Sequence, residues 1–250
     1  FYRNRPPPPI PFSQLLPTYN TDWSAALSSG RAQIYGLDTH QGRVRGRGDS
    51  TNGCTVIAPL IVHEHLKSSG GVSDDAVVAV IDSYAGPHLN TIRTKLGLSP
   101  TALIIPSDVH DHLVDLKILS QDLFVAASGG NILDSDHVNN FIAGLNERKG
   151  KSAAALFFHA HVVCVVKMNV GGECWYDLID SLPSSHPGTS TPSGSRIRCK
   201  SADVLATCIR WYAANKLTPA DKEFCDKSAW DDGMCDFDPR VFQGFVWADK

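Results

Sequence analysis

Residues 161–182, HVVCVVKMNVGGECWYDLIDSL, contain two runs of β-forming residues joined by a pair of glycines. Both runs are rich in valine, isoleucine and aromatic residues, which favour strands over helices. Gly171 and Gly172 give the backbone the freedom that a tight turn between two strands requires. The stretch therefore predicts an antiparallel hairpin, and the apolar residues before it extend the first strand back to Ala155.

The predicted hairpin places one histidine beside one aspartate. Pairing the strands symmetrically about the glycines sets Val163 opposite Asp180, and residues two apart on a strand share a face of the sheet. His161 and Asp180 are then diagonal neighbours on one face, whereas Asp177 points to the other face. His159 shares the face of His161 but lies further from Asp180. The arrangement suits an imidazole oriented by a carboxylate, and a shift of one residue in register would abolish it.

A cysteine at the start of a helical pattern gives this pair a possible purpose. In residues 46–60, GRGDSTNGCTVIAPL, a polar glycine-rich loop leads to Cys54 and then to apolar residues with helical spacing. A thiol nucleophile needs a base that removes its proton and a third group that orients the base. Taken alone, Cys54 is equally consistent with a buried apolar residue. The pair of His161 and Asp180, taken alone, is equally consistent with an ordinary pair on a sheet surface. Together the three predict a nucleophilic site.

These residues resemble the papain-like cysteine peptidases, and within them the deubiquitinases and ubiquitin-like proteases. The resemblance rests on Cys54 at the head of a helix, on the strand HVVCVVK that begins at His161, and on the strand WYDLIDSL. The two strands are similar to those of Josephin-type enzymes. The matched blocks are residues 50–66 and 159–183. The resemblance implies an α+β papain-like fold, in which the nucleophile helix belongs to a helical N-terminal part and packs on an antiparallel β-sheet.

The resemblance also implies a reaction. Cys54 would attack the carbonyl at the C-terminus of ubiquitin or a ubiquitin-like protein, and water would hydrolyse the resulting thioester. His161 would serve as general base and then as general acid, with Asp180 as its orienting group. The backbone N–H of Cys54 and one side-chain donor would form the oxyanion hole. The expected partner is thus ubiquitin or a relative, bound as substrate.

The side-chain donor of the oxyanion hole is where the sequence departs from this family. Its members usually place glutamine or asparagine five or six residues before the nucleophile, where this chain has Asp49 and Gly48. Asn52 is the nearest amide and becomes the candidate, while Gln41 is distant but within reach through a folded loop. An ionised Asp49 would repel an oxyanion, so we expect it to act through water or a turn hydrogen bond.

The remainder of the chain fits one catalytic domain. Residues 1–19 form a Pro-rich N-terminal arm, with Pro6 to Pro9 as polyproline II, and residues 20–250 form a single papain-like catalytic domain. Serine and aspartate pairs at 73–74, 107–108 and 135–136 predict the starts of three helices. A helix is expected over 201–217, a long Ser/Pro/Gly loop over 181–195 and a last strand over 240–247. Helices followed by antiparallel strands indicate the α+β class.

Charge and hydropathy exclude several other classes. The formal net charge of −3 creates no field that favours nucleic acid or an anionic membrane, and Arg43, Arg45 and Arg47 lack interleaved aromatic residues. No apolar run approaches the roughly 18–20 residues that a membrane span needs. His63, Glu64 and His65 do not match the HExxH spacing of zinc enzymes and are expected on a solvated helix face. We therefore expect no nucleic acid, membrane, metal or cofactor partner.

The cysteines indicate the compartment. Seven cysteines occur, an odd number without a CxxC pair, and several lie within apolar stretches. This pattern favours a reducing, intracellular setting (cytoplasmic or nuclear) over a disulfide framework. A monomer is expected.

Two other functions stay open at this level. A transglutaminase-like acyl transfer uses the same three residue types, and a catalytically inactive binding module could keep the same fold. Such a module could also use Arg47-Gly48-Asp49, the tripeptide of cell-adhesion ligands. In a chain predicted to be intracellular, chance is the simpler explanation of this short motif.

Overall fold

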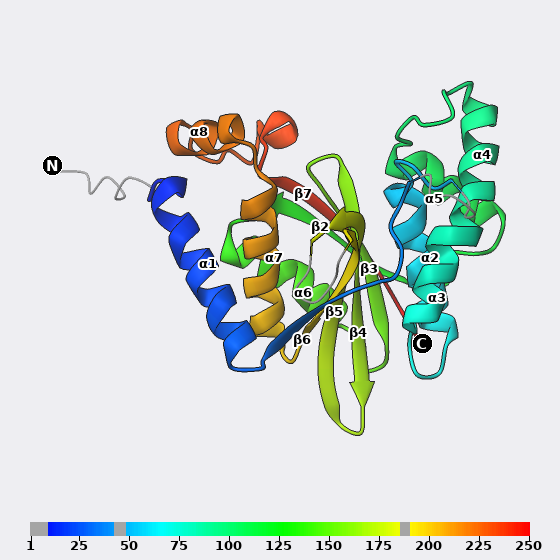
Figure 1. Cartoon of the computed structure of the whole chain (residues 1–250), viewed down its shortest axis with the longest axis horizontal. Helices are drawn as coiled ribbons and strands as arrows, with labels where there is room; N and C mark the ends of the chain where they lie inside the picture. Colours follow the sequence, from blue (N-terminus) through cyan, green and yellow to red (C-terminus); the bar gives the residue numbers. More distant parts are fainter. Residues whose placement is uncertain (1–9, 43–48, 186–190) are drawn as a thin grey trace, which may run out of the picture.

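The computed structural model describes residues 10–42, 49–185 and 191–250, which form one antiparallel sheet with helices on both of its faces (Figure 1). Within these residues the strand order is β1-β6-β5-β4-β3-β7-β2, and every neighbouring pair is antiparallel. The strands are β1 (Ala32–Gly36), β2 (Phe124–Asn131), β3 (Ser152–Phe158), β4 (His161–Val170), β5 (Glu173–Ser184), β6 (Ser193–Cys199) and β7 (Val241–Ala248).

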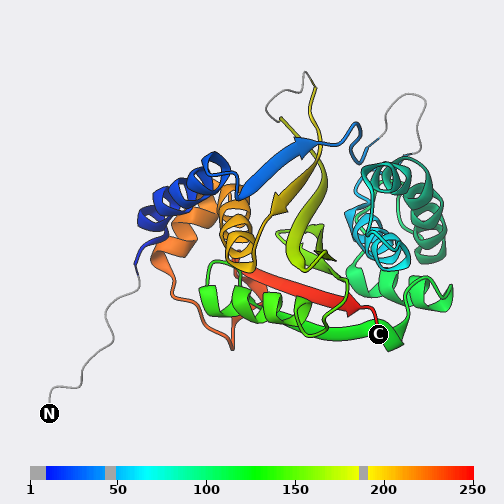
Figure 2. The ribbon, with the colours of Figure 1, turned by 90° about the horizontal axis from the view of Figure 1, so that it is seen from below.

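The helices divide between the two faces of the sheet, as Figure 2 shows for α1 and α7 on one side and α2 to α4 on the other. The α-helices are α1 (Phe12–Ser28), α2 (Cys54–Lys67), α3 (Asp74–Ala79), α4 (Ala85–Leu96), α5 (Pro106–Asp115), α6 (Ser135–Leu145), α7 (Ala202–Lys216) and α8 (Pro219–Lys227). Single turns of other helix types are η1 (Val80–Tyr84), η2 (Gln121–Leu123) and η3 (Cys235–Phe237). The α+β prediction is confirmed.

Helix α2 is the central helix of its half of the molecule. Residues 54–62 are all buried, as expected of a helix that is apolar on every side and surrounded by protein. Its neighbours include β3 and β4 on one side and α4 and α5 on the other. The predicted packing of this helix on an antiparallel sheet is thus confirmed. Because α2 starts at Cys54, the fold fixes that residue at the end of a rigid element.

The hairpin register agrees with the prediction, but the first strand was predicted too long. Val170 pairs with Glu173, and the ladder continues to Cys164 opposite Ile179. The predicted strand from Ala155 is instead interrupted by a turn at His159 and Ala160, whose φ angles are 53° and 55°. Neither residue is the glycine or asparagine that usually marks such a turn, so this turn could not be predicted from the residue types. His159 therefore lies outside the strand on which it was predicted.

Other boundaries also differ from the predictions. Helix α1 begins at Phe12 and crosses residue 19, the predicted end of the Pro-rich arm, because Phe12 and Trp23 are both buried in the core. The predicted polyproline segment lies outside the described residues. Strand β6 occupies part of the predicted Ser/Pro/Gly loop, and β2 was not predicted. Both strands contain many small residues, which weaken the strand signal.

Helix starts were predicted well where the sequence offers a capping hydroxyl. The Ser73 side chain accepts a hydrogen bond from the N–H of Ala76, and the Ser201 side chain from that of Val204. The third predicted start is displaced by one residue, because the Asp134 side chain caps α6. Helix α5 begins with proline at its first position.

A buried charge network ties the helical half to the sheet. Asp177 is fully buried, and its carboxylate accepts hydrogen bonds from Arg196 and Arg198 at 2.8 Å. Arg196 also donates to Asp74, the first residue of α3, at 2.8 Å, and to the carbonyl of Val72, just before α3, at 2.9 Å. As predicted, Asp177 faces away from Asp180. This side of β5 therefore anchors the helices that follow α2.

Replacing Asp177 with alanine is expected to lower the free energy of unfolding by about 3–5 kcal/mol, because it removes the buried carboxylate of Arg196 and leaves only the half-exposed Asp74 as its ionic partner. Urea unfolding followed by circular dichroism measures the change. Asp111→Ala is the control, since that side chain is 83% exposed and its loss should cost about 0.5 kcal/mol or less. Equal stability of the two variants would contradict the anchoring role.

Candidate active site

His161 and Asp180 meet as the hairpin predicts. The Nε2 atom of His161 lies 2.7 Å from Oδ1 of Asp180, and the two residues are 9% and 4% exposed. His161 is the first residue of β4, so its ring lies at the end of the sheet nearest the turn from β3. The N–H of Leu182 also donates to Oδ1 of Asp180, at 2.9 Å. The carboxylate is therefore fixed from the backbone as well as from the histidine.

Cys54 reaches the same place from the other half of the molecule. It is the first residue of α2 and is 2% exposed, and its thiol is close enough to His161 to help raise the pKa of that imidazole. Because Nε2 of His161 faces Asp180, Nδ1 is the ring nitrogen left for the thiol. Gly53 precedes Cys54 in a confined position, where a β-carbon would lie 2.6 Å from the carbonyl oxygen of Ser50. The structure thus brings the three predicted residues together.

The surroundings of His161 favour its protonated form. Burial by itself lowers the pKa of His161, but the hydrogen bonds and charges of Asp180 and Cys54 outweigh burial and raise the pKa to about 9. Burial raises the pKa of Asp180, and the opposing contributions of His161, Lys216 and Tyr212 bring it below its ordinary value. An imidazolium held between a carboxylate and a thiol stabilises the thiolate, which is the nucleophilic form of cysteine.

The two amides considered for an oxyanion hole are placed differently. Asn52 is exposed and donates its side-chain N–H to the carbonyl of Thr101 at 2.8 Å. Gln41 is buried, and its backbone N–H donates to the carbonyl of Ser181, next to Asp180. The side-chain Oε1 of Gln41 accepts from the Ser181 hydroxyl at 2.8 Å, which leaves Nε2 as a donor. Gln41 is therefore the amide that the structure holds beside the histidine and aspartate strands.

The position of Gln41 follows from an irregularity in β5. The ladder between β5 and β6 shifts register after Asp180. Residues 37–42 fill this gap, since Leu37 donates to the carbonyl of Gly194 and Gln41 to that of Ser181. Asp49, the residue expected to make a turn hydrogen bond, accepts one from the N–H of Thr51 at 3.0 Å. No pattern in the sequence predicted that residues 37–42 pair with a strand edge.

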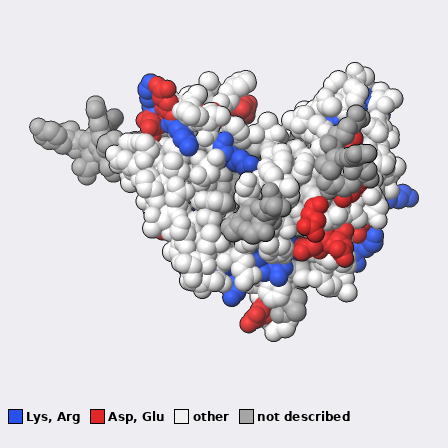
Figure 3. All heavy atoms as spheres, in the orientation of Figure 1, with Lys and Arg blue, Asp and Glu red and all other residues white. Residues whose placement is uncertain are grey.

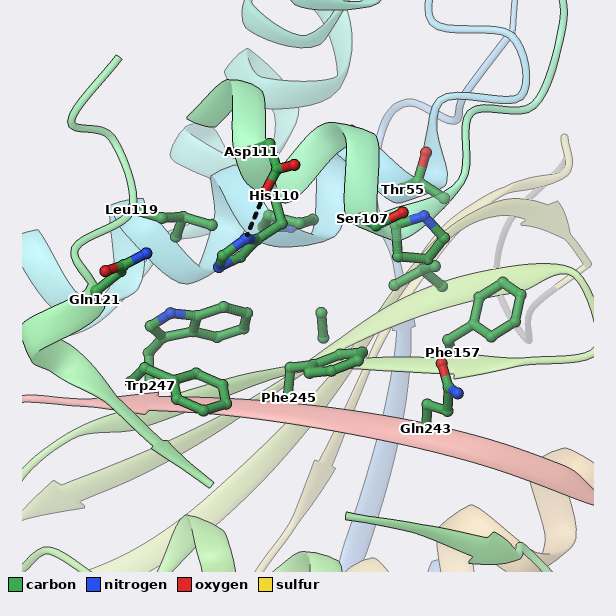
Figure 4. Close-up of a pocket in the computed structure, with 15 residues that line it drawn as sticks. Thr55, Ser107, His110, Asp111, Leu119, Gln121, Phe157, Gln243, Phe245 and Trp247 are labelled. Carbon is green, nitrogen blue, oxygen red and sulfur yellow. Dashed lines mark ion pairs between the residues drawn. The ribbon is translucent and has the colours of Figure 1, made fainter. Parts of the chain in front are cut away.

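An apolar groove of about 630 Å³ lies between α5 and the sheet (Figure 4). Thr55 and Val162, which directly follow Cys54 and His161 in the chain, are among its lining residues, whereas Cys54 and His161 themselves do not line it. Figure 4 shows the rings of Phe157, Phe245 and Trp247 on the sheet side, facing α5 across the groove. Lining residues on the helical side include Pro59 of α2, Pro106 and His110 of α5, and Leu119 in the segment after α5, and no lysine or arginine lines the groove among the described residues. The groove suits an uncharged, apolar polypeptide segment.

The remaining histidines and charges point to no second site. His65, expected on a solvated face, is buried between the carbonyl of Lys167 and the N–H of Val72, and burial lowers its pKa to about 4. No group of three metal-binding side chains occurs among the residues that the structure describes. Figure 3 shows acidic residues over α3 and mixed charges over α8, with a largely uncharged surface between them. Arg43, Arg45 and Arg47 lie outside the described residues.

Two general properties bear on the predicted setting of the protein. All seven cysteines are free thiols. In the described parts of the chain, no helix is both long and apolar enough to cross a membrane.

The raised pKa of His161 predicts how stability depends on pH. The imidazolium contributes fully below its unfolded-state pKa of 6.5, and the contribution is lost as pH rises through about 9. The free energy of unfolding should therefore fall between pH 6 and 9.5 by up to a few kcal/mol more in the wild type than in His161→Gln. Urea titrations at both pH values measure this difference, and identical pH dependence in the two proteins would refute the charged pair.

Comparison with known proteins supports the fold and gives no family from sequence. No protein-family model matches the chain, and no curated protein sequence matches it. Among solved structures, it is similar to the ubiquitin-specific protease encoded by a tegument protein of murine cytomegalovirus, solved in complex with a ubiquitin-based suicide substrate. The two share 9% sequence identity with a TM-score of 0.50, over 86% of this chain and 84% of that chain. The chain therefore has an α+β fold similar to that of a papain-like viral deubiquitinase.

Proposed function

We propose that this protein is a thiol isopeptidase that hydrolyses the bond at the C-terminus of ubiquitin or a ubiquitin-like protein. The observation that carries the proposal is the meeting of Cys54, His161 and Asp180, which come from three separate segments of the chain. A buried histidine that is hydrogen-bonded to a carboxylate and has a thiol nearby has the composition of a cysteine-hydrolase triad. Residues 20–250 would act as one catalytic domain.

The geometry supports a two-stage reaction. The Cys54 thiolate attacks the substrate carbonyl carbon, and the electron pair of the C=O bond moves to oxygen. When the tetrahedral adduct collapses, the C–N bond breaks and the leaving amine takes the proton from His161, giving a thioester. His161 then removes a proton from water, which attacks the thioester and releases the carboxylate product and Cys54. Asp180 keeps the His161 ring in place through both stages.

The oxyanion formed in each stage needs donors that are already oriented. The backbone N–H of Cys54 lies at the N-terminus of α2, where the first N–H groups of a helix have no intrahelical partner. We assign the second donor to Nε2 of Gln41 rather than to Asn52, because Asn52 bonds Thr101 while Gln41 is held beside Asp180 by its two bonds to Ser181.

The choice of substrate rests on the fold and the groove together. The structurally similar viral protease was captured with a ubiquitin-based suicide substrate. The apolar groove between α5 and β7 is lined in part by Thr55 and Val162, the chain neighbours of Cys54 and His161, and we assign to it a segment of polypeptide near the bond to be cleaved. On this proposal the protein works as a monomer inside the cell and needs no metal or cofactor.

Capture by a ubiquitin probe tests the proposal directly. Wild-type protein should form a covalent adduct with ubiquitin that carries a C-terminal propargyl amide, and Cys54→Ala should form none, because the probe reacts with a thiol at the cleavage site. Intact-protein mass spectrometry measures the adduct. Cys235→Ala is the control, since Cys235 is a partly exposed thiol outside the site and its loss should leave capture unchanged.

Probes built on ubiquitin-like proteins belong in the same experiment. Capture by one of these and not by ubiquitin would keep the enzyme assignment and change the substrate. If every probe fails, and Cys54→Ala cleaves a ubiquitin-fluorophore substrate as the wild type does, the isopeptidase function is wrong.

The oxyanion assignment makes its own prediction. Gln41→Ala should lower kcat by about 10²–10³ with little change in KM, because the donor acts on charge that develops only in the transition state. Asn52→Ala should stay close to the wild-type rate. Hydrolysis of the ubiquitin-fluorophore substrate measures both variants. The opposite ranking of the two variants would return the role to Asn52.

A further inference from the structure

The Asp180 carboxylate has a second set of partners that the proposed reaction does not require. Its Oδ1 atom receives His161 and the N–H of Leu182, whereas its Oδ2 atom receives the hydroxyl of Tyr212 at 2.7 Å. The ammonium of Lys216 lies 3.8 Å from the same Oδ2. Both oxygens are thus engaged, and the two groups that contact Oδ2 both come from helix α7.

Helix α7 is rigidly placed for this contact. Its N-terminus is capped by Ser201, and the ring of Trp211 stacks on that of Trp23 in α1 with centroids 4.8 Å apart. At the next residue, Tyr212, the ammonium of Lys216 lies above the ring, 5.0 Å from its centroid. Two consecutive residues of the helix are therefore both held by ring contacts, and the Tyr212 hydroxyl is held at a set position relative to the sheet.

A small cavity lies on the side of Asp180 that faces α7. Its volume is about 310 Å³, and its lining includes Asp180, Tyr212, Lys216, Asn215 and Ser195. A carboxylate that borders a cavity is not held in place by close packing on that side, so a hydrogen bond must supply the constraint. The Tyr212 hydroxyl is the group that supplies it at hydrogen-bond distance.

Tyr212 stays a donor over the whole working range of pH. Burial and the charge of Asp180 raise the pKa of the Tyr212 hydroxyl well above its ordinary value, so the hydroxyl keeps its proton. The hydrogen bond in turn helps to lower the pKa of Asp180. A neutral donor is thus directed at a carboxylate that must remain ionised beside His161.

We propose that Tyr212 is a positioning residue for the candidate triad: its hydroxyl holds the Asp180 carboxylate in the orientation that keeps the His161 ring directed toward Cys54. This inference rests on the proposed function, because it concerns the same site. In the proposed role, Tyr212 contacts neither the substrate nor the thiol, and it acts only through Asp180.

Tyr212→Phe tests the proposal by removing one oxygen atom. The variant should lower kcat for the ubiquitin-fluorophore substrate by about tenfold without changing KM, because one charge-assisted hydrogen bond is lost. The acid limb of the pH profile should move to higher pH, since Asp180 keeps His161, Lys216 and the Leu182 N–H but loses Tyr212. Tyr176→Phe is the matched control: its buried hydroxyl bonds Asn146 at 2.7 Å, away from the site.

A second readout does not depend on ubiquitin. The rate at which iodoacetamide alkylates Cys54, followed on the Cys54 peptide by mass spectrometry, reports the thiolate that His161 stabilises. Tyr212→Phe should slow this reaction several-fold and shift its pH profile, while Tyr176→Phe should do neither. In an Asp180→Ala background, Tyr212→Phe should have no further effect, because the hydroxyl acts through the carboxylate.

The two readouts separate the failure of this proposal from the failure of the proposed function. If wild-type protein ignores ubiquitin probes but Tyr212→Phe still changes Cys54 alkylation, the substrate is wrong and the positioning role stands. Wild-type rates and pH profiles in Tyr212→Phe would overturn the positioning role. An equal slowing of alkylation by Tyr212→Phe with and without Asp180 would overturn it as well.

Discussion

The register between β4 and β5 is the constraint on which the rest of the structure depends. Side chains alternate between the faces of a strand, so Asp177 and Asp180, three positions apart, must point in opposite directions. One face then presents Asp180 to His161, and the other presents Asp177 to Arg196. A slip of one residue would exchange these faces, placing a carboxylate away from the histidine and leaving a buried arginine unpaired. The same hairpin therefore builds the candidate site and anchors the helices.

The second requirement is that α2 is held at the correct position along the sheet. Near its C-terminal end, the ammonium of Lys151 donates to the carbonyls of His65 and Leu66, and His65 itself bonds the carbonyl of Lys167. These contacts join α2 to β3 and β4 at one end of the helix, and Cys54 lies at the other end. Because a helix is rigid along its axis, fixing the last turn also fixes where the thiol meets His161.

Local pattern predicts the parts of this site that lie on one hairpin or at one helix start. The glycine pair and the alternation of residues were enough to place His161 beside Asp180, and the loop before Cys54 was enough to mark a helix start. Gln41 could be named only as a distant amide that a folded loop would bring within reach, and Tyr212 was not found at all. Gln41 depends on an irregular strand edge that residues 37–42 fill, and Tyr212 depends on how α7 crosses β5. Such contacts are set by tertiary packing, which carries no short-range signature.

The similarity of fold to the viral protease, at only 9% sequence identity, is consistent with the importance of tertiary packing over local sequence. A fold can persist while most side chains change, provided that core positions stay apolar and strands keep their register. A likeness of fold then carries no residue roles with it, and the chemistry must be argued from this chain's own contacts. Here the thiol, the imidazole and the carboxylate come from α2, β4 and β5, and α7 adds the hydroxyl on the carboxylate. The imidazole and the carboxylate meet within one hairpin, but the thiol and the hydroxyl reach them only when the helices dock on the sheet, so the nucleophile is assembled only in the completed fold.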